Sequence, residues 1–107
     1  MQETKEFAAG VIREEFEKRG IEVKKLILFG SRARGDARTD SDWDFLVVIN
    51  PPVIWPEKRK IWLSVSRKLA KHYIAAELLI KSEDEYSHDI SDKGKVTYYA
   101  NKEGVFA

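Results

Sequence analysis

A run of apolar residues, Phe45 to Ile49, constrains the fold of this 107-residue chain more than any other feature. A strand with one face in water alternates apolar and polar side chains, whereas every side chain in this run is apolar. We therefore expect a central β-strand over Asp42–Ile49 that is covered on both faces. Pro51 and Pro52 follow the run and are expected to end the strand.

Two helices are predicted from apolar residues spaced three and four positions apart. The first spans Thr4–Arg19 and ends at Gly20, a residue type common just after a helix. Its apolar stripe consists of Phe7, Ala8, Val11, Ile12 and Phe16. The second spans Glu57–Tyr73 and begins after Pro56. Its inner stripe consists of Trp62, Val65, Leu69 and Tyr73.

Two further strands are expected over Val23–Phe29 and Ile74–Ile80, which are both rich in apolar residues. Residues 94–103 leave two alternatives open. Val96–Ala100 forms a short strand by composition, or the segment forms a last helical turn or two closed by Gly104. The order helix–strand–strand–helix–strand predicts one α/β domain over residues 1–107, with a small mixed sheet flanked by helices.

Composition excludes several classes of protein. The chain has no cysteine, which excludes disulfide scaffolds, thiolate metal sites and cysteine nucleophiles. A hydrophobic content of 43% excludes a disordered chain. No apolar stretch approaches the roughly 18–20 residues that span a membrane, and the charged start does not resemble a secretion signal. We expect a cytoplasmic protein with no membrane association.

Charge is unevenly distributed along the chain, although the net charge is only +1. Residues 23–81 carry a net charge of +6, between ends of −2 (residues 1–22) and −3 (residues 82–107). A basic middle between acidic ends suits a pocket for a small anion better than an extended nucleic-acid track. Nothing in the sequence directly indicates nucleic-acid binding.

Asp42 and Asp44 stand at the head of the predicted central strand. Residues two apart in a strand share a face, so their carboxylates are expected side by side. Oxygen ligands of this kind suit Mg²⁺, which completes its shell with water and phosphates. A polar strand entrance with both aspartates solvated is the alternative, and for this pair taken alone it is the simpler one.

Gly30 and Ser31 follow the first predicted strand directly. A glycine there allows a ligand to approach the backbone, and the serine hydroxyl and following amides suit phosphate oxygens. Arg32, Arg34 and Arg38 lie in the same loop, and the arginine fork matches phosphate geometry. A solvated, mobile loop would also accommodate these arginines.

Glu77 interrupts the apolar run of the last predicted strand. A carboxylate is costly to bury unless it is paired or bound to a cation. It therefore acts as a metal ligand or base beside Asp42 and Asp44, or it faces solvent on an edge strand, or it pairs with a basic residue. Three carboxylates on two strands beside a phosphate-holding loop together describe metal-assisted phosphoryl or nucleotidyl transfer.

The stretch from Leu28 to Val48 resembles the minimal nucleotidyltransferases of the DNA polymerase β superfamily. Gly30-Ser31, ten intervening residues and Asp42-x-Asp44 reproduce the G-S-x10-D-x-D signature of that family. The tail from Val96 to Val105 also resembles the family's ending, in which a helix closes before E-G. The resemblance implies a polymerase β palm-like fold.

The resemblance also implies roles for individual residues. Gly30 and Ser31 would hold the triphosphate of ATP, with Arg32 in the same loop and Arg34 at a position where relatives often carry a phosphate-contacting arginine. Asp42 and Asp44 would bind Mg²⁺. Glu77 would be the third carboxylate, a position that is more often Asp in the family.

Small members of this family are often paired with a helical HEPN-domain toxin, and some act as antitoxins by transferring AMP to a toxin tyrosine. The resemblance therefore implies a Mg²⁺-dependent protein adenylyltransferase with a HEPN toxin as partner. A catalytically silent antitoxin that neutralises its toxin by covering it is the alternative. A chain of this length is expected to rely on a partner protein or on self-association, as a homo-oligomer, to complete acceptor binding.

Other polar and aromatic residues are assigned structural positions. We expect Trp55 and Trp62 in or partly in the core, although tryptophan is also enriched in interfaces. Tyr98 and Tyr99 are expected to pack, and His72 and His88 receive no role. A solvated helix face is expected for the basic residues Lys58, Arg59, Lys60, Arg67, Lys68 and Lys71.

Overall fold

A mixed sheet with strand order β3-β2-β1-β4 organises the computed structural model, which describes residues 2–107. β1 pairs antiparallel with both β2 and β4, and β2 pairs parallel with β3. The elements are α1 (Gln2–Glu17), β1 (Glu22–Phe29), α2 (Ser31–Arg34), β2 (Trp43–Asn50), α3 (Glu57–Ala70), β3 (Ala76–Ser82), α4 (Glu83–Asp89), α5 (Val96–Glu103) and β4 (Val105–Phe106).

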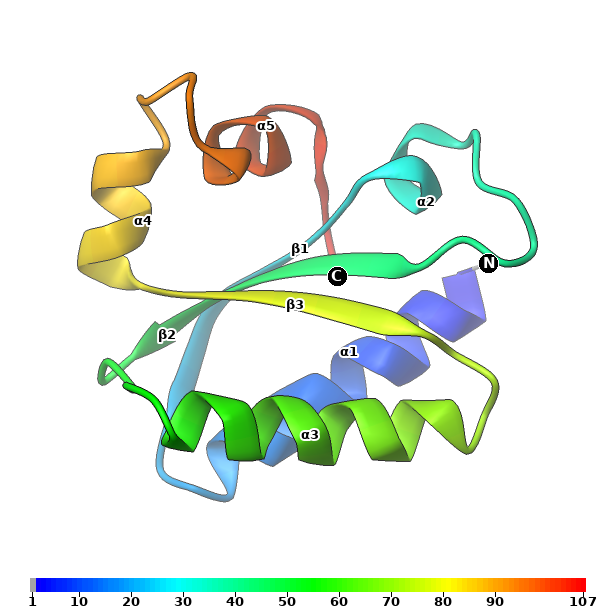
Figure 1. Ribbon diagram of the computed structural model, residues 1–107, viewed down its shortest axis with the longest axis horizontal. Helices are drawn as coiled ribbons and strands as arrows, with labels where there is room; N and C mark the ends of the chain where they lie inside the picture. The colour runs from blue at the N-terminus through cyan, green and yellow to red at the C-terminus, as the bar shows by residue number, and fades with distance from the viewer. Residues whose placement is uncertain (1) are drawn as a thin grey trace.

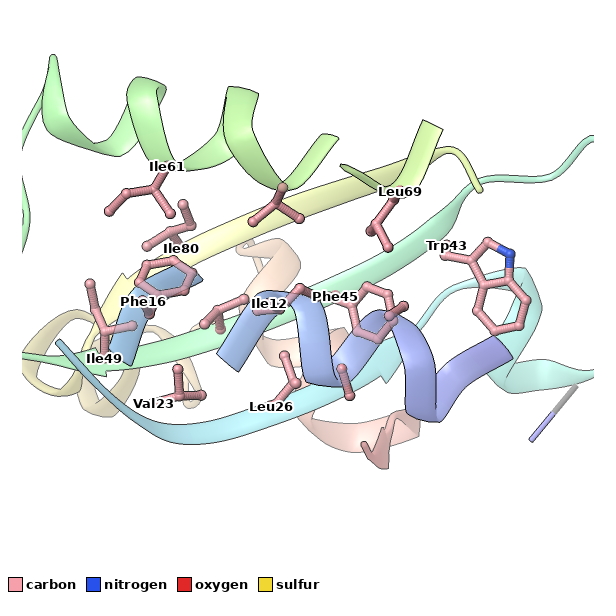
Figure 2. Packing of buried hydrophobic residues seen from close by; sticks show 14 of the residues in the cluster. Ile12, Phe16, Val23, Leu26, Trp43, Phe45, Ile49, Ile61, Leu69 and Ile80 are labelled. Atoms are coloured by element: carbon pink, nitrogen blue, oxygen red, sulfur yellow. The ribbon is translucent and has the colours of Figure 1, made fainter. Parts of the chain in front are cut away.

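Helices cover both faces of the sheet (Figure 1). α1 and α3 pack on one face, where Ile12, Phe16 and Ile61 meet Phe45 and Ile49 in the larger core cluster (Figure 2). α4 and α5 cover the opposite face through a smaller cluster that includes Leu46, Val48, Tyr86 and Ala100. Residues 45–49 are all buried, which confirms the prediction of a central strand covered on both sides.

The predicted helices and strands are present within a few residues of their expected ends. α1 ends near Gly20, whose φ of 76° is the left-handed conformation that glycine adopts without strain. The tail is helical: α5 ends at Glu103, and β4 then pairs with β1 beyond Gly104. The sequence did not predict α2 or α4, because helices this short carry too few turns for a periodic pattern.

Three apolar residues are more exposed than predicted. Tyr73 is 99% exposed because α3 ends at Ala70, so Tyr73 lies in the following turn rather than on the inner stripe. Trp55 is 64% exposed, which makes its expected core position wrong, whereas Trp62 is half-buried. Phe7 is 42% exposed and contacts the ring of His72 edge-on.

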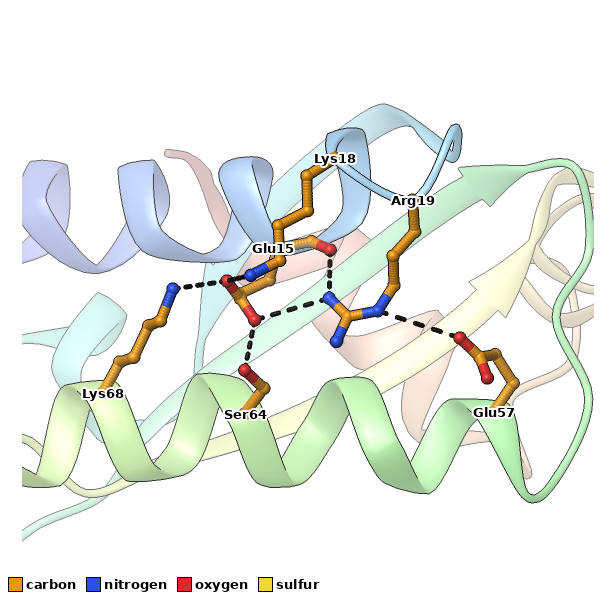
Figure 3. Close-up of polar contacts among 6 residues, drawn as sticks. All are labelled: Glu15, Lys18, Arg19, Glu57, Ser64 and Lys68. Carbon is orange, nitrogen blue, oxygen red and sulfur yellow. Dashed lines mark hydrogen bonds and ion pairs between the residues drawn. The ribbon is translucent and has the colours of Figure 1, made fainter.

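A buried carboxylate, Glu15, joins α1 to α3 (Figure 3). Lys68 Nζ lies 2.6 Å and Lys18 Nζ 2.7 Å from Glu15 Oε2, and the Ser64 hydroxyl donates to Oε1. Arg19 also contacts Glu15 and donates to its backbone carbonyl at 2.6 Å. Burial raises the pKa of Glu15, but the bonds from Lys18, Lys68, Ser64 and Arg19 together hold it well below its usual range.

Within residues 2–107, no helix combines the length and apolar character that crossing a bilayer requires.

Candidate active site

Asp44 and Glu77 are register partners on the parallel strands β2 and β3. Asp44 is half-buried, whereas Glu77 is exposed on β3, which is an edge strand. Asp42 is exposed and lies just before β2, two residues from Asp44. Because register partners and residues two apart point to the same face of a sheet, the three carboxylates lie on one face at one end of β2.

The pKa of Asp44 is raised, and three effects contribute to the increase. Burial of the carboxylate is the largest, followed by the negative charges of Asp42 and Glu77. Arg34 opposes the increase with its positive charge. The charges of Asp42, Glu77 and Arg34 therefore all act on the carboxylate of Asp44.

Gly30 follows β1 directly and lies close to the side chain of Asp44. Its φ of 77° and ψ of −159° belong to a region that essentially only glycine occupies. A Cβ added at this position would overlap the carboxylate of Asp44. Both the backbone conformation and the close approach therefore require glycine here, directly beside the most perturbed carboxylate.

The residues after Gly30 form the short helix α2. The Gly30 carbonyl accepts hydrogen bonds from the backbone N–H groups of Ala33 and Arg34, both at 3.0 Å. The first N–H groups of a helix have no partner within it and suit an anion. Arg34 is exposed and pairs with Asp36 at 3.3 Å. Ser31 and Arg34 are the first and last residues of α2, which follows Gly30, and the charge of Arg34 acts on Asp44.

Arg32 turns toward the loop that precedes Asp42. Its Nη2 donates to the carbonyl oxygens of Ser41 at 2.9 Å and Thr39 at 3.3 Å. The guanidinium carbon lies 4.7 Å from the centre of the Trp43 ring, and the Nε group is buried without a protein hydrogen-bond partner. These contacts tie α2 to the start of β2.

The carboxylates lie on an open surface, since Asp42 and Glu77 are exposed and Asp44 is half-buried. Across residues 2–107, no three or more His, Cys, Asp or Glu side chains are already arranged to hold a metal ion. The donor chemistry nevertheless fits Mg²⁺, because Asp42, Asp44 and Glu77 supply only oxygen ligands. Burial and the negative charges of Asp42 and Glu77 raise the pKa of Asp44, and a bound cation would offset those charges.

Two features of the structure, one in this region and one between α1 and α3, have no counterpart in the sequence analysis. Arg32 was assigned to nucleotide binding, and its contacts with the loop carbonyls have no local sequence signal. Glu15 was not singled out, although a signal existed: position 15 follows Val11 and Ile12 by four and three residues and so falls on the apolar stripe of α1.

A family model described as "Polymerase beta, Nucleotidyltransferase" matches residues 11–103. The match includes β1, the loop with α2, β2, α3, β3 and α5, and therefore every candidate residue named above. No curated protein matches the chain in a sequence search.

Proposed function

Because this chain belongs to the polymerase β nucleotidyltransferase family, we propose that it is a Mg²⁺-dependent enzyme that transfers AMP from ATP to a hydroxyl group of a partner protein. The observation that carries the proposal is the position of Asp44, which lies close to Gly30 and is the register partner of Glu77 on the neighbouring strand. A loop suited to phosphates and a group of carboxylates thus meet at one end of β2.

In this proposal Gly30, Ser31 and Arg34 bind the triphosphate, while Asp42 and Asp44 hold Mg²⁺ with Glu77 as the third carboxylate. The bound ion supplies positive charge that offsets the charge on the phosphates. The residues of the chain position the α-phosphorus for attack. Arg32 holds the loop that carries Asp42 through its bonds to Thr39 and Ser41.

The transfer forms a bond between the acceptor oxygen and the α-phosphorus of ATP. The bond between that phosphorus and the bridging oxygen breaks, and pyrophosphate leaves. Glu77 accepts the proton of the acceptor hydroxyl. Exposure of Glu77 at the sheet edge supports this role, because an acceptor can approach it directly from outside the sheet.

We propose a tyrosine of a HEPN-domain toxin as the acceptor, so that the enzyme acts as the antitoxin of a toxin–antitoxin pair in the cytoplasm. The open surface around the carboxylates supports an acceptor supplied by another protein. A silent antitoxin that only covers its toxin is the second candidate.

The first test is a thermal-shift titration with ATP, Mg²⁺ and both together. A ligand at about 100 times its dissociation constant adds about 2.7 kcal/mol, which for this chain length corresponds to an increase in Tm on the order of ten degrees. The increase should require both ligands and should be lost in Asp44→Asn. Asp40→Asn, which removes an exposed carboxylate from the loop before β2, is the matched control.

The second test separates the two candidates. Incubation with a HEPN toxin and ATP labelled at the α-phosphate should label the toxin and release pyrophosphate. Neutralisation of the toxin by Asp44→Asn at the wild-type level would favour the silent antitoxin.

A further inference from the structure

A groove of about 400 Å³ runs between α3 and the outer strand β3. Trp55, Lys58, Arg59 and Trp62 line it from the α3 side, and residues 78–81 line it from β3. The groove begins at Leu78, directly after the carboxylate of Glu77. An exposed tryptophan and a half-buried one beside an open strand edge are unusual on a surface that has no partner.

The outer edge of β3 offers free backbone groups to this groove. Within residues 2–107, β3 pairs only with β2. The Trp43 N–H donates to the Ala75 carbonyl at 2.8 Å, which turns odd-numbered residues of β3 toward β2. In a parallel ladder the alternate residues face the other way, so the N–H and C=O groups of Leu78 and Ile80 point to the open edge.

The open edge ends at Ser82. Its N–H is the next outward-facing donor, and it is taken by the Glu85 side chain at 2.9 Å in the capping box of α4. The stretch available for a further strand is therefore short, and it lies between the carboxylates and α4.

An added strand would present its side chains alternately to the two faces of the sheet. Leu78 and Ile80 belong to the core cluster on the α3 side, whereas Leu79 packs with the cluster on the opposite face. Side chains on the first face would enter the groove beside Trp55 and Trp62. Side chains on the second face would lie on the face of Glu77, where the carboxylates gather.

The charge of the groove indicates an acidic occupant. Lys58 and Arg59 form no ion pair within residues 2–107, whereas Lys81 is paired with Asp89 at 3.1 Å. A second copy of this chain is disfavoured, because pairing β3 with itself would bring two basic α3 helices to the same edge. The free N–H and C=O groups match the backbone of a polypeptide strand, whereas the sugar–phosphate backbone of RNA carries no such repeating row of N–H and C=O groups.

We propose that this α3–β3 groove docks an extended, acidic segment of the acceptor protein, which adds to β3 as a further strand and places its hydroxyl-bearing side chain beside Glu77. The docking itself rests on the groove, the open edge and the charge of α3. Only the delivery of the hydroxyl group rests on the proposed function.

The test uses a fluorescein-labelled peptide and the full chain. Groove-facing positions of the peptide are leucine and glutamate, and the alternate positions are threonine with a single central tyrosine. Fluorescence anisotropy should show saturable binding that weakens at least tenfold when alternate backbone nitrogens are methylated. Binding should also weaken at least tenfold in Trp55→Ala, an exposed change that leaves the core intact, and in Lys58→Glu/Arg59→Glu.

Two controls sharpen the result. Lys93→Glu, an exposed change in the turn after α4, should bind the peptide as the wild type does. A peptide with lysine in place of glutamate should bind the charge-reversed variant better than the wild type. Failure of the wild type to bind, or binding that methylation leaves unchanged, overturns the proposal.

Other occupants have their own signatures. Displacement of the peptide by a single-stranded uridine oligonucleotide would assign the groove to RNA, and a dimer that dissociates in Trp55→Ala would assign it to a second copy. Either result overturns the proposal. The thermal shift with ATP and Mg²⁺ is measured on the same proteins. If the wild type binds the peptide but shows no nucleotide-dependent shift, that result counts against the proposed function and not against docking in the groove.

Discussion

Asp44 and Glu77 are register partners on the neighbouring strands β2 and β3, although they belong to distant parts of the sequence. The negative charge of Glu77 is one of the causes that raise the pKa of Asp44. Like charges on neighbouring strands repel each other, and a bound cation would offset that repulsion.

Asp44→Asn is expected to raise the Tm of the ligand-free protein by a few degrees at pH 7. The pKa of Asp44 is higher in the folded chain than its ordinary value of 3.8, so ionisation of this group above that pH costs stability. The amide removes this cost. Thermal unfolding at pH 7 checks the direction, and a lower Tm would show that Asp44 stabilises the empty fold.

Glu77→Gln is expected to lower the rate of AMP transfer by about 10²–10⁴-fold, the usual contribution of a general base. The nucleotide-dependent increase in Tm should persist, because Asp42 and Asp44 remain. Single-turnover transfer of an α-phosphate label measures the rate. Glu83→Gln, an exposed change in the first turn of α4, is the control, and an equal rate in both variants would leave Glu77 as a solvated edge residue.

Gly30→Ala is expected to lower stability and to abolish the nucleotide-dependent increase in Tm. The added Cβ overlaps the Asp44 carboxylate and adds backbone strain of about 1–3 kcal/mol. Gly20→Ala separates the two effects, because Gly20 also has a positive φ but an added Cβ there meets open space. Thermal shifts with and without ATP and Mg²⁺ compare them, and a retained nucleotide response in Gly30→Ala would contradict the prediction.

Arg32→Gln is expected to loosen the loop that precedes Asp42. The variant loses the guanidinium stacking on Trp43 and the fork that reaches Thr39 and Ser41. Amide hydrogen exchange over residues 36–42 should accelerate, and nucleotide binding should weaken with it. Arg38→Gln is the matched change in the same loop and should leave exchange unaltered. Weaker nucleotide binding with unchanged exchange would instead make Arg32 a direct phosphate ligand.

Glu15→Gln is expected to destabilise the protein by about 1–3 kcal/mol at pH 7, because charge-assisted hydrogen bonds from Lys18, just after α1, and from Lys68 in α3 are lost. The pKa of Glu15 is depressed in the folded state, so its stabilisation is present above the ordinary value of 4.5 and is lost as the pH falls below it. The difference between variant and wild type should therefore shrink in acid.

Urea unfolding at pH 7, 4 and 3 measures this dependence on pH. Glu17→Gln, an exposed change on the same helix, should remain within about 0.5 kcal/mol of the wild type at each pH. A difference for Glu15→Gln that stays constant with pH would exclude its ionised carboxylate as the cause.

The local pattern of the sequence was sufficient for the elements and for part of the site. The apolar run from Phe45 to Ile49 predicted a strand covered on both faces. Successive side chains of a strand point to opposite faces of the sheet, so an unbroken apolar run has apolar side chains to bury on each face. The motif of Gly30, Ser31, Asp42 and Asp44 identified the family that the match over residues 11–103 shows. Each of these signals lies within one continuous segment.

Only the tertiary structure decided which distant residues meet. The register of β2 against β3 places Glu77 beside Asp44. The packing of α1 on α3 brings Lys68 to Glu15, and the end of α3 at Ala70 leaves Tyr73 in solvent. Whether a residue is buried can be predicted from its neighbours in the sequence, because the periodicity of a helix or strand shows which face is apolar. Contact between two segments depends instead on how their surfaces fit, and neither segment encodes that fit alone.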